Sequence, residues 1–264
     1  MKLLSPPFMA ALLALVSMPS ARALEFRFLA WDDVVAARPV SVLEGKDKVA
    51  AIKDLHPLKR SPKVDADLKD GSLLLRAMDK KDAAGKPVDF SVKVPAEMTR
   101  PLVLLVSDPK AASGLRGYVL EDNVANFPWG TFRFLNVCGT DLAVTLGSLS
   151  KAVPAAWQPL DFLPGEKKPL AVEIAMKDKK SGRLQTAYAS MWNDDPDVRR
   201  LVFVAPGTDP RLGPLEIKIV PEDRKNLGAN GAGADPGADG GGEGGGKGVT
   251  GGGTSRSAEY QEGE

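Results

Sequence analysis

A run of oxygen-bearing side chains is the best candidate for chemistry in this sequence. Asn193-Asp194-Asp195-Pro196-Asp197 places these side chains directly after Trp192. Calcium prefers several hard oxygen ligands, and extracellular domains often hold it on loops between strands. The predicted calcium ligands are Asp194, Asp195 and Asp197. The alternative is a solvated turn whose charge is neutralised by Arg199 and Arg200, because the spacing of an EF-hand loop is absent.

Nucleophilic catalysis has few candidates, because the chain holds one histidine and one cysteine. His56 is the one residue that could serve as general base in a Ser-His-Asp or Cys-His arrangement. In an internal repeat described below it corresponds to Gln158, which favours a polar surface position. Cys138 could be a redox-active thiol or pair with another chain, but a half-buried structural residue is favoured. A zinc site built from several His or Cys ligands is excluded.

The four tryptophans are the remaining candidates for binding. An exposed indole on a sheet can stack on a sugar or anchor a protein partner. Trp192, at the end of an alternating stretch beside the acidic run, and Trp157 are the predicted binding residues. The competing interpretation places Trp157 in a core. Trp129, in Phe127-Pro128-Trp129-Gly130, is predicted to wedge between two modules and fix their angle.

Composition narrows the class of protein. The chain has 264 residues, 43% of them hydrophobic, and 35 basic against 34 acidic side chains give a formal net charge of +1. This length supplies one large or two ordinary domains. The balanced charge argues against a nucleic-acid binder, which needs a basic face to displace counterions. The sequence contains no P-loop, nucleophile elbow or dinucleotide fingerprint, so an enzyme is not expected.

Both ends of the chain differ from its middle. Lys2, the apolar run Phe8–Val16 and the small-x-small sequence Ala21-Arg22-Ala23 predict a signal peptide over residues 1–23. That run is shorter than the ~20 residues that span a bilayer, and no second long apolar run follows. No transmembrane segment is therefore expected in the mature chain. Residues 227–264 hold more than half of the 27 glycines and almost no apolar side chains, which predicts a disordered Gly-rich tail.

Between these ends the sequence repeats itself. Phe26-Arg27-Phe28-Leu29 recurs as Phe132-Arg133-Phe134-Leu135, and Arg100-Pro101-Leu102-Val103 recurs as Arg199-Arg200-Leu201-Val202. Further matches keep the same order, so two copies of one module are predicted. The predicted modules cover residues 24–123 and 131–226, joined by a linker over 124–130.

Each copy has the pattern of short β-strands. Val88–Val94 and Leu170–Met176 alternate apolar with polar or small side chains, as half-buried strands do. Leu102–Val106 and Leu201–Val204 are continuous apolar runs, which predicts central strands buried on both faces. The predicted fold class is therefore all-β, with two tandem immunoglobulin-like antiparallel β-sandwich modules from an internal duplication and a disordered Gly-rich tail.

One segment resembles a known group of proteins. Phe132–Pro164 reads FRFLNVCGTDLAVTLGSLSKAVPAAWQPLDFLP. It resembles bacterial secreted tandem immunoglobulin-like β-sandwich repeats of unknown function, in which an aromatic-rich "RF-N" strand precedes a "V-V-G" strand. The resemblance implies the sandwich fold and a secreted location, and it implies no active site.

These features predict a non-enzymatic protein that is exported to the periplasm or secreted. Its role would be structural or binding, through loops and strand edges held on a rigid scaffold. The predicted partner is a protein or glycan of the envelope or extracellular space, and the calcium ion above is the one cofactor considered. The alternatives are a carbohydrate-binding module using Trp192 or Trp157, and an exported hydrolase using His56.

Overall fold

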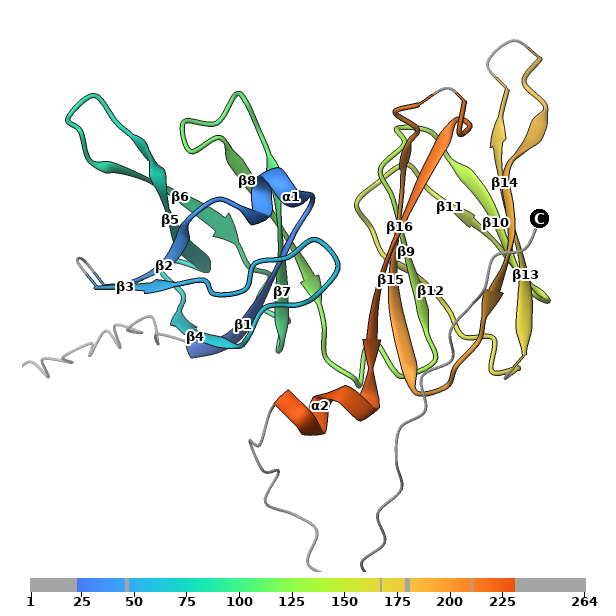
Figure 1. The fold of residues 1–264 in the computed structure, drawn as a ribbon, viewed down its shortest axis with the longest axis horizontal. Helices are drawn as coiled ribbons and strands as arrows, with labels where there is room; N and C mark the ends of the chain where they lie inside the picture. Colours follow the sequence, from blue (N-terminus) through green and yellow to red (C-terminus); the bar gives the residue numbers. More distant parts are fainter. Residues whose placement is uncertain (1–22, 46–47, 167, 179–180, 210, 231–264) are drawn as a thin grey trace, which may run out of the picture.

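The structure is a computed structural model that describes residues 23–230, except 46–47, 167, 179–180 and 210 (Figure 1). The predicted signal peptide, apart from its last residue, and the glycine-rich segment from residue 231 onward lie outside these residues. The described chain folds into four β-sheets, two in each half of the sequence.

The first module is a sandwich of two four-stranded sheets. Its inner sheet, which faces the second module, has the strand order β4-β1-β7-β8, and its outer sheet has the order β3-β2-β5-β6. All neighbours in these sheets are antiparallel except β1 and β7, which are parallel. The elements are β1 (Ala23–Ala30), α1 (Asp33–Ala36), β2 (Val40–Glu44), β3 (Lys48–Ala51), β4 (Val64–Asp67), β5 (Ser72–Lys81), β6 (Pro87–Lys93), β7 (Pro101–Ser107) and β8 (Leu115–Glu121).

The second module repeats this arrangement strand by strand. Its inner sheet has the order β12-β9-β15-β16, again with one parallel pair, β9 and β15, and its outer sheet has the order β11-β10-β13-β14. The elements are β9 (Phe132–Asn136), β10 (Leu142–Leu146), β11 (Leu149–Val153), β12 (Leu160–Phe162), β13 (Pro169–Lys177), β14 (Leu184–Asn193), β15 (Val198–Pro206), β16 (Leu215–Asp223) and α2 (Arg224–Asn230). The predicted fold class of two tandem β-sandwich modules is confirmed.

Two details differ from the sequence-based expectations. Each module contains one parallel strand pair, which an antiparallel sandwich does not include. The boundary predicted between Asn226 and the tail falls inside α2, because the chain continues from β16 directly into this helix. Within the described residues, no helix is long and apolar enough to cross a membrane.

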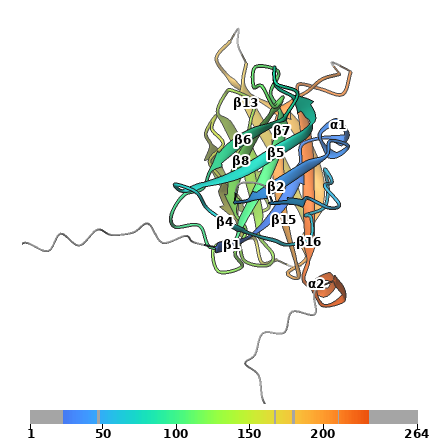
Figure 2. The ribbon, with the colours of Figure 1, turned by 90° about the vertical axis from the view of Figure 1, so that its left-hand side faces the viewer.

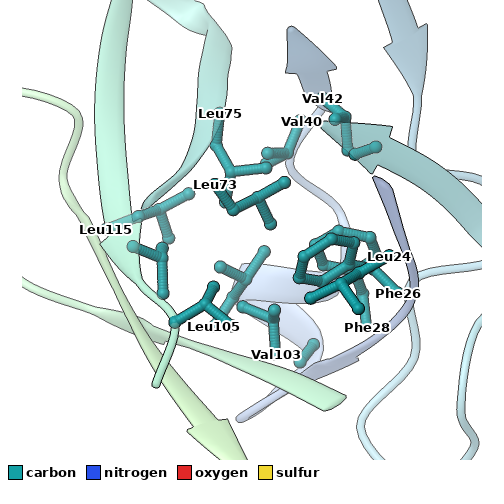
Figure 3. Packing of buried hydrophobic residues seen from close by; sticks show 14 of the residues in the cluster. Leu24, Phe26, Phe28, Val40, Val42, Leu73, Leu75, Val103, Leu105 and Leu115 are labelled. Atoms are coloured by element: carbon teal, nitrogen blue, oxygen red, sulfur yellow. The ribbon is translucent and has the colours of Figure 1, made fainter. Parts of the chain in front are cut away.

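Alternation along the strands builds a separate core in each module. In the first module Phe26, Phe28, Leu73, Leu75 and Leu105 are fully buried and point into a common interior (Figure 3). In the second module Phe132 and Phe134 on β9 repeat the pair on β1, and Leu170, Val172 and Ile174 face them from β13. Period-2 patterning places these side chains on one face of each sheet, as expected.

A third apolar cluster joins the modules, because the two inner sheets pack against each other through their outer faces (Figure 1). Its members occupy matching places in the two copies. The pairs are Leu29 with Leu135, Leu102 with Leu201, Leu104 with Phe203, and Leu120 with Val220. The continuous apolar runs on β7 and β15 are thus explained, since one face of each strand fills its own sandwich and the other meets the neighbouring module. The two modules form one four-layered body.

Candidate functional site

The acidic run lies in the turn between β14 and β15, and its carboxylates face separate partners. Asp194 accepts a hydrogen bond from the backbone N–H of Glu166 at 2.8 Å. Asp195 accepts one from the N–H of Asp197 at 2.9 Å, and Asp197 pairs with Lys225 Nζ at 3.3 Å. Among the residues that the structure describes, no group of three or more His, Cys, Asp or Glu side chains could hold a metal ion. The structure therefore does not gather Asp194, Asp195 and Asp197 into the predicted calcium site.

Trp192 cannot be the exposed platform that the sequence suggested. Its side chain is 9% exposed and belongs to the core of the second module. The indole stacks on Phe132 and Phe134, with ring centroids 5.9 and 6.0 Å away, and its Nε1 donates to the hydroxyl of Tyr188 at 3.1 Å. Trp192 lies on the inner face of β14 with Tyr188, so the alternation predicted for this strand was sound and its buried face was misassigned.

Trp157 is partly buried at the junction of the modules. Its ring stacks on Tyr118 of β8 with centroids 4.0 Å apart, and it meets Trp31 edge-on at 6.3 Å. The sequence offered either a sugar platform or packing inside its own module. The structure shows neither, because one face of the ring is covered by a residue of the other module.

His56 stands on the surface, away from any catalytic arrangement. The side chain is exposed, and its Nδ1 accepts a hydrogen bond from the backbone N–H of Leu58 at 2.9 Å. In the described part of the chain, no Ser or Asp side chain is hydrogen-bonded to the imidazole. His56 therefore stabilises a local turn, which is the condition under which the hydrolase alternative loses its general base.

Cys138 is half-buried, as the favoured interpretation predicted. Its Sγ donates to the carbonyl oxygen of Val204 at 3.3 Å, and its backbone N–H donates to Asn136 Oδ1 at 2.9 Å. Burial raises the pKa of the thiol to about 11, because the thiolate would lose hydration. The thiol form therefore predominates at neutral pH.

We expect Cys138 to react slowly with alkylating agents. At pH 8 its iodoacetamide rate should be roughly a hundredfold below that of free cysteine, because the thiolate is the nucleophile and a free thiol has a pKa near 8.5. The rate should rise until the pH passes the thiol pKa of about 11. Mass spectrometry of timed samples measures it, with unfolded protein as the control. A native rate equal to the unfolded rate would show an accessible, activated thiol.

Sequence reasoning missed a buried cluster of charges between the inner sheets. Arg60 donates to both carboxylate oxygens of Asp122 at 2.9 Å, and Arg199 donates through Nε to Glu222 at 2.6 Å. Arg27 pairs with Glu222 at 2.6 Å from the other module. Burial alone would raise the pKa of Glu222, but the charges of Arg60, Arg199 and Arg27 outweigh it and hold that pKa below its usual range.

The same arginine also fixes the linker. Arg199 donates through Nη1 to the carbonyl oxygens of Asp122 at 2.9 Å and Phe127 at 3.0 Å. The ring of Phe127 is fully buried between the guanidinium groups of Arg133, 4.2 Å from its centroid, and Arg199, 4.9 Å away. Trp129, predicted as the wedge, is partly buried beside Arg199. Phe127 therefore occupies the wedge position expected of Trp129.

A lysine ties the modules at the other end of the junction. Lys218 on β16 donates to the carbonyl oxygens of Ala30, at 3.1 Å, and Trp31, and its Nζ lies 5.2 Å from the centroid of Trp31. Burial lowers the pKa of this ammonium to about 8, although Asp32 and Asp33 oppose the shift. Cross-module polar contacts thus border the apolar interface on two sides.

The largest hollow lies in the first module, between the edge strands β6 and β8 (Figure 2). It has a volume of about 390 Å³, within the range of ligand-binding sites. Phe90, Val92, Leu115 and Gly117 form its apolar floor. The charged residues on its rim are Asp89, Lys93, Asp108, Lys110 and Arg116. A smaller hollow of about 40 Å³ adjoins the buried charges and has room for a few waters.

Gly117 sets the width of this groove. A Cβ placed there would lie 2.5 Å from Val92 Cγ2, so β8 approaches β6 more closely than a side chain allows. We expect Gly117→Ala to lower the free energy of unfolding by about 1–3 kcal/mol through overpacking. Urea denaturation measures the change. Adding Val92→Ala should recover part of the loss, and a purely additive double mutant would contradict this account of Gly117.

Comparisons with known proteins leave the fold as the firm result. No family model and no curated protein matches the chain. Among solved structures, one of the two C2 domains of Extended-Synaptotagmin 2 is similar with 12% identity and a TM-score of 0.24, covering 84% of this chain and 98% of that chain. A TM-score this low supports no inference about function. The strand order alone defines the chain as a tandem β-sandwich protein of two equivalent modules.

Proposed function

We propose that this chain is an exported, non-enzymatic binding scaffold of the periplasm or extracellular space. The observation that carries the proposal is the closed junction between the modules. Apolar packing of the two inner sheets, the buried charges and the wedge of Phe127 hold both sandwiches in one orientation. A rigid body of this kind presents loops and strand edges at fixed distances, which is how binding scaffolds achieve specificity.

Several observations support a non-enzymatic role. His56 is exposed and forms a local turn, and the raised pKa of Cys138 keeps its thiol protonated. The sugar-platform alternative loses its support because Trp192 is buried and Trp157 is stacked on Tyr118. The groove between β6 and β8 remains as the open surface with both apolar and charged character. The predicted partner is therefore a protein of the envelope or extracellular space.

Export is supported by the sequence of residues 1–23, whose charged start, apolar run and small-x-small end are those of a signal peptide. The resemblance of Phe132–Pro164 to bacterial secreted sandwich repeats supports the same location. Cell fractionation of the full chain and of a version lacking residues 2–23 tests it. The full chain should leave the cytoplasm and lose residues 1–23, whereas retention of the intact chain in the cytoplasm would contradict export.

A pull-down from envelope extract tests the binding role. The bait is the chain from Leu24, compared with a version ending at Asn230 so that α2 is kept. We expect both baits to enrich the same partner, because binding is assigned to the folded body. Capture that requires residues 231–264 would move the contact to the tail. No protein enriched above an unrelated β-sandwich bait would contradict the binding role.

A further inference from the structure

We propose that the groove of the first module binds an extended, acidic segment of a partner protein, which adds as a strand to the free edge of β6. This inference rests on the proposed binding function and names the chemistry of the partner.

The backbone of β6 is available for pairing. β6 is the last strand of its sheet and pairs with β5 on one side, from Ser72 opposite Lys93 to Ala77 opposite Val88. Its other side opens on the groove, and β8, which faces it there, is the last strand of the inner sheet. Unpaired N–H and C=O groups on a sheet edge are a template for an incoming strand.

The groove also has an apolar floor for alternate side chains of such a strand. Phe90 is partly buried, while Val92 and Leu115 are buried at the margin of the first module's core. Side chains of an added strand alternate between this floor and the solvent, because strands have a period of two residues. An apolar residue at every second position of the partner therefore fits the groove.

Charge decides the other positions of the partner. Both acids on the rim already have basic partners, since Asp89 is held by Arg76 at 2.6 and 3.0 Å and Asp108 by Arg116 at 2.7 Å. Lys93 and Lys110 are exposed on the rim and form no ion pair with another described residue. Two unneutralised ammonium groups beside an open edge favour carboxylates on the added strand and disfavour neutral or basic strands.

Synthetic peptides test the proposal on the folded chain from Leu24. The probe is acetyl-Glu-Val-Glu-Val-Glu-Val-Glu-amide, about as long as β6, and its comparisons replace every Glu by Gln or by Lys. We expect the Glu peptide to bind about tenfold more tightly than the Gln peptide, equal to ~1.4 kcal/mol, and the Lys peptide not to bind. Calorimetry gives the affinities, and amide shifts should map to β6. Equal affinity for all three peptides, or shifts elsewhere, would overturn the proposal.

Charge reversal in the protein supplies the matched control. The double variant Lys93→Glu/Lys110→Glu should bind the Glu peptide about tenfold more weakly and gain affinity for the Lys peptide. Lys53→Glu/Lys177→Glu makes the same change in net charge at exposed lysines away from the groove, and its affinities should stay unchanged. A loss of the same size in both double variants would reduce the effect to net charge and overturn the assignment to the groove.

Two further measurements separate this inference from its neighbours. A Glu peptide methylated at every backbone nitrogen should not bind, because it cannot pair with β6, and undiminished binding would overturn strand addition. Binding that appears only after removal of residues 231–264, or a dimer that Lys93→Glu dissociates, would assign the groove to the chain's own tail or to a second copy. Partner capture from envelope extract without any peptide binding would overturn the groove proposal and leave the scaffold function standing.

Discussion

Replacing Phe127 by alanine is expected to lower the free energy of unfolding by about 3–5 kcal/mol, since a fully buried aromatic side chain would leave a cavity. The ring lies between the guanidinium groups of Arg133 and Arg199 and packs on the apolar interface of the inner sheets. Its loss therefore removes packing, cation–π contacts and the wedge of the linker together. Urea denaturation followed by tryptophan fluorescence measures the change.

Phe127→Leu is the control for this substitution. Leucine keeps most of the apolar volume and loses the cation–π contacts, so it should cost clearly less than alanine. Trp129→Ala, at the position that the sequence favoured as the wedge, should also cost less because Trp129 is partly exposed. If Trp129→Ala proved more damaging than Phe127→Ala, the linker would be held in another way.

Replacing Arg199 by methionine is expected to destabilise the protein by a similar amount, about 3–5 kcal/mol. The guanidinium pairs with Glu222 and lies 3.4 Å from Asp122, and all three side chains are less than 10% exposed. Methionine leaves Asp122 and Glu222 in a buried site without this counter-charge. Arg60 and Arg27 remain nearby and limit the loss. Thermal and urea unfolding of the variant measure it.

The repeat provides a matched control for Arg199. Arg100 holds the corresponding position in the first module, where its side chain is exposed. Arg100→Met should therefore change the stability by less than about 0.5 kcal/mol, as exposed substitutions usually do. Equal effects of the two substitutions would show that burial of the charges contributes nothing.

The effect of Arg199→Met should depend on pH in one direction. The folded-state pKa of Glu222 lies below its ordinary value of 4.5, so its pairing contributes stability above that pH and loses it as the pH falls through the lowered folded-state pKa. In the variant, protonation of Glu222 and Asp122 removes their unpaired charges. The difference in unfolding free energy between wild type and variant should thus narrow below about pH 4.5. A difference that widened in acid would contradict the assigned charges.

The fold followed from the sequence because its signals are local and repeated. Alternation on Leu170–Met176 and the recurrence of Phe26–Leu29 at Phe132–Leu135 fix strands and modules without knowledge of their packing. The continuous apolar runs on β7 and β15 even contained the module interface, since two buried faces need two neighbours. What they did not reveal is that the second neighbour is the other module.

The residues that join the modules could not be predicted in the same way. Arg60, Asp122, Arg199 and Glu222 come from four separated places in the chain, and nothing in their local sequence distinguishes them from exposed charges. Trp192 was misassigned because alternation identifies two faces of a strand but not which face is buried. The groove depends on the distance between β6 and β8, which Gly117 permits and which no periodicity reports.

Differential scanning calorimetry of the chain from Leu24 tests the central claim, that the two modules form one rigid body. A joined body should unfold in a single transition whose calorimetric and van't Hoff enthalpies agree, because neither module keeps its inner sheet covered without the other. Two separate transitions in the wild-type chain, or a calorimetric enthalpy about twice the van't Hoff value, would show independent modules and contradict the scaffold.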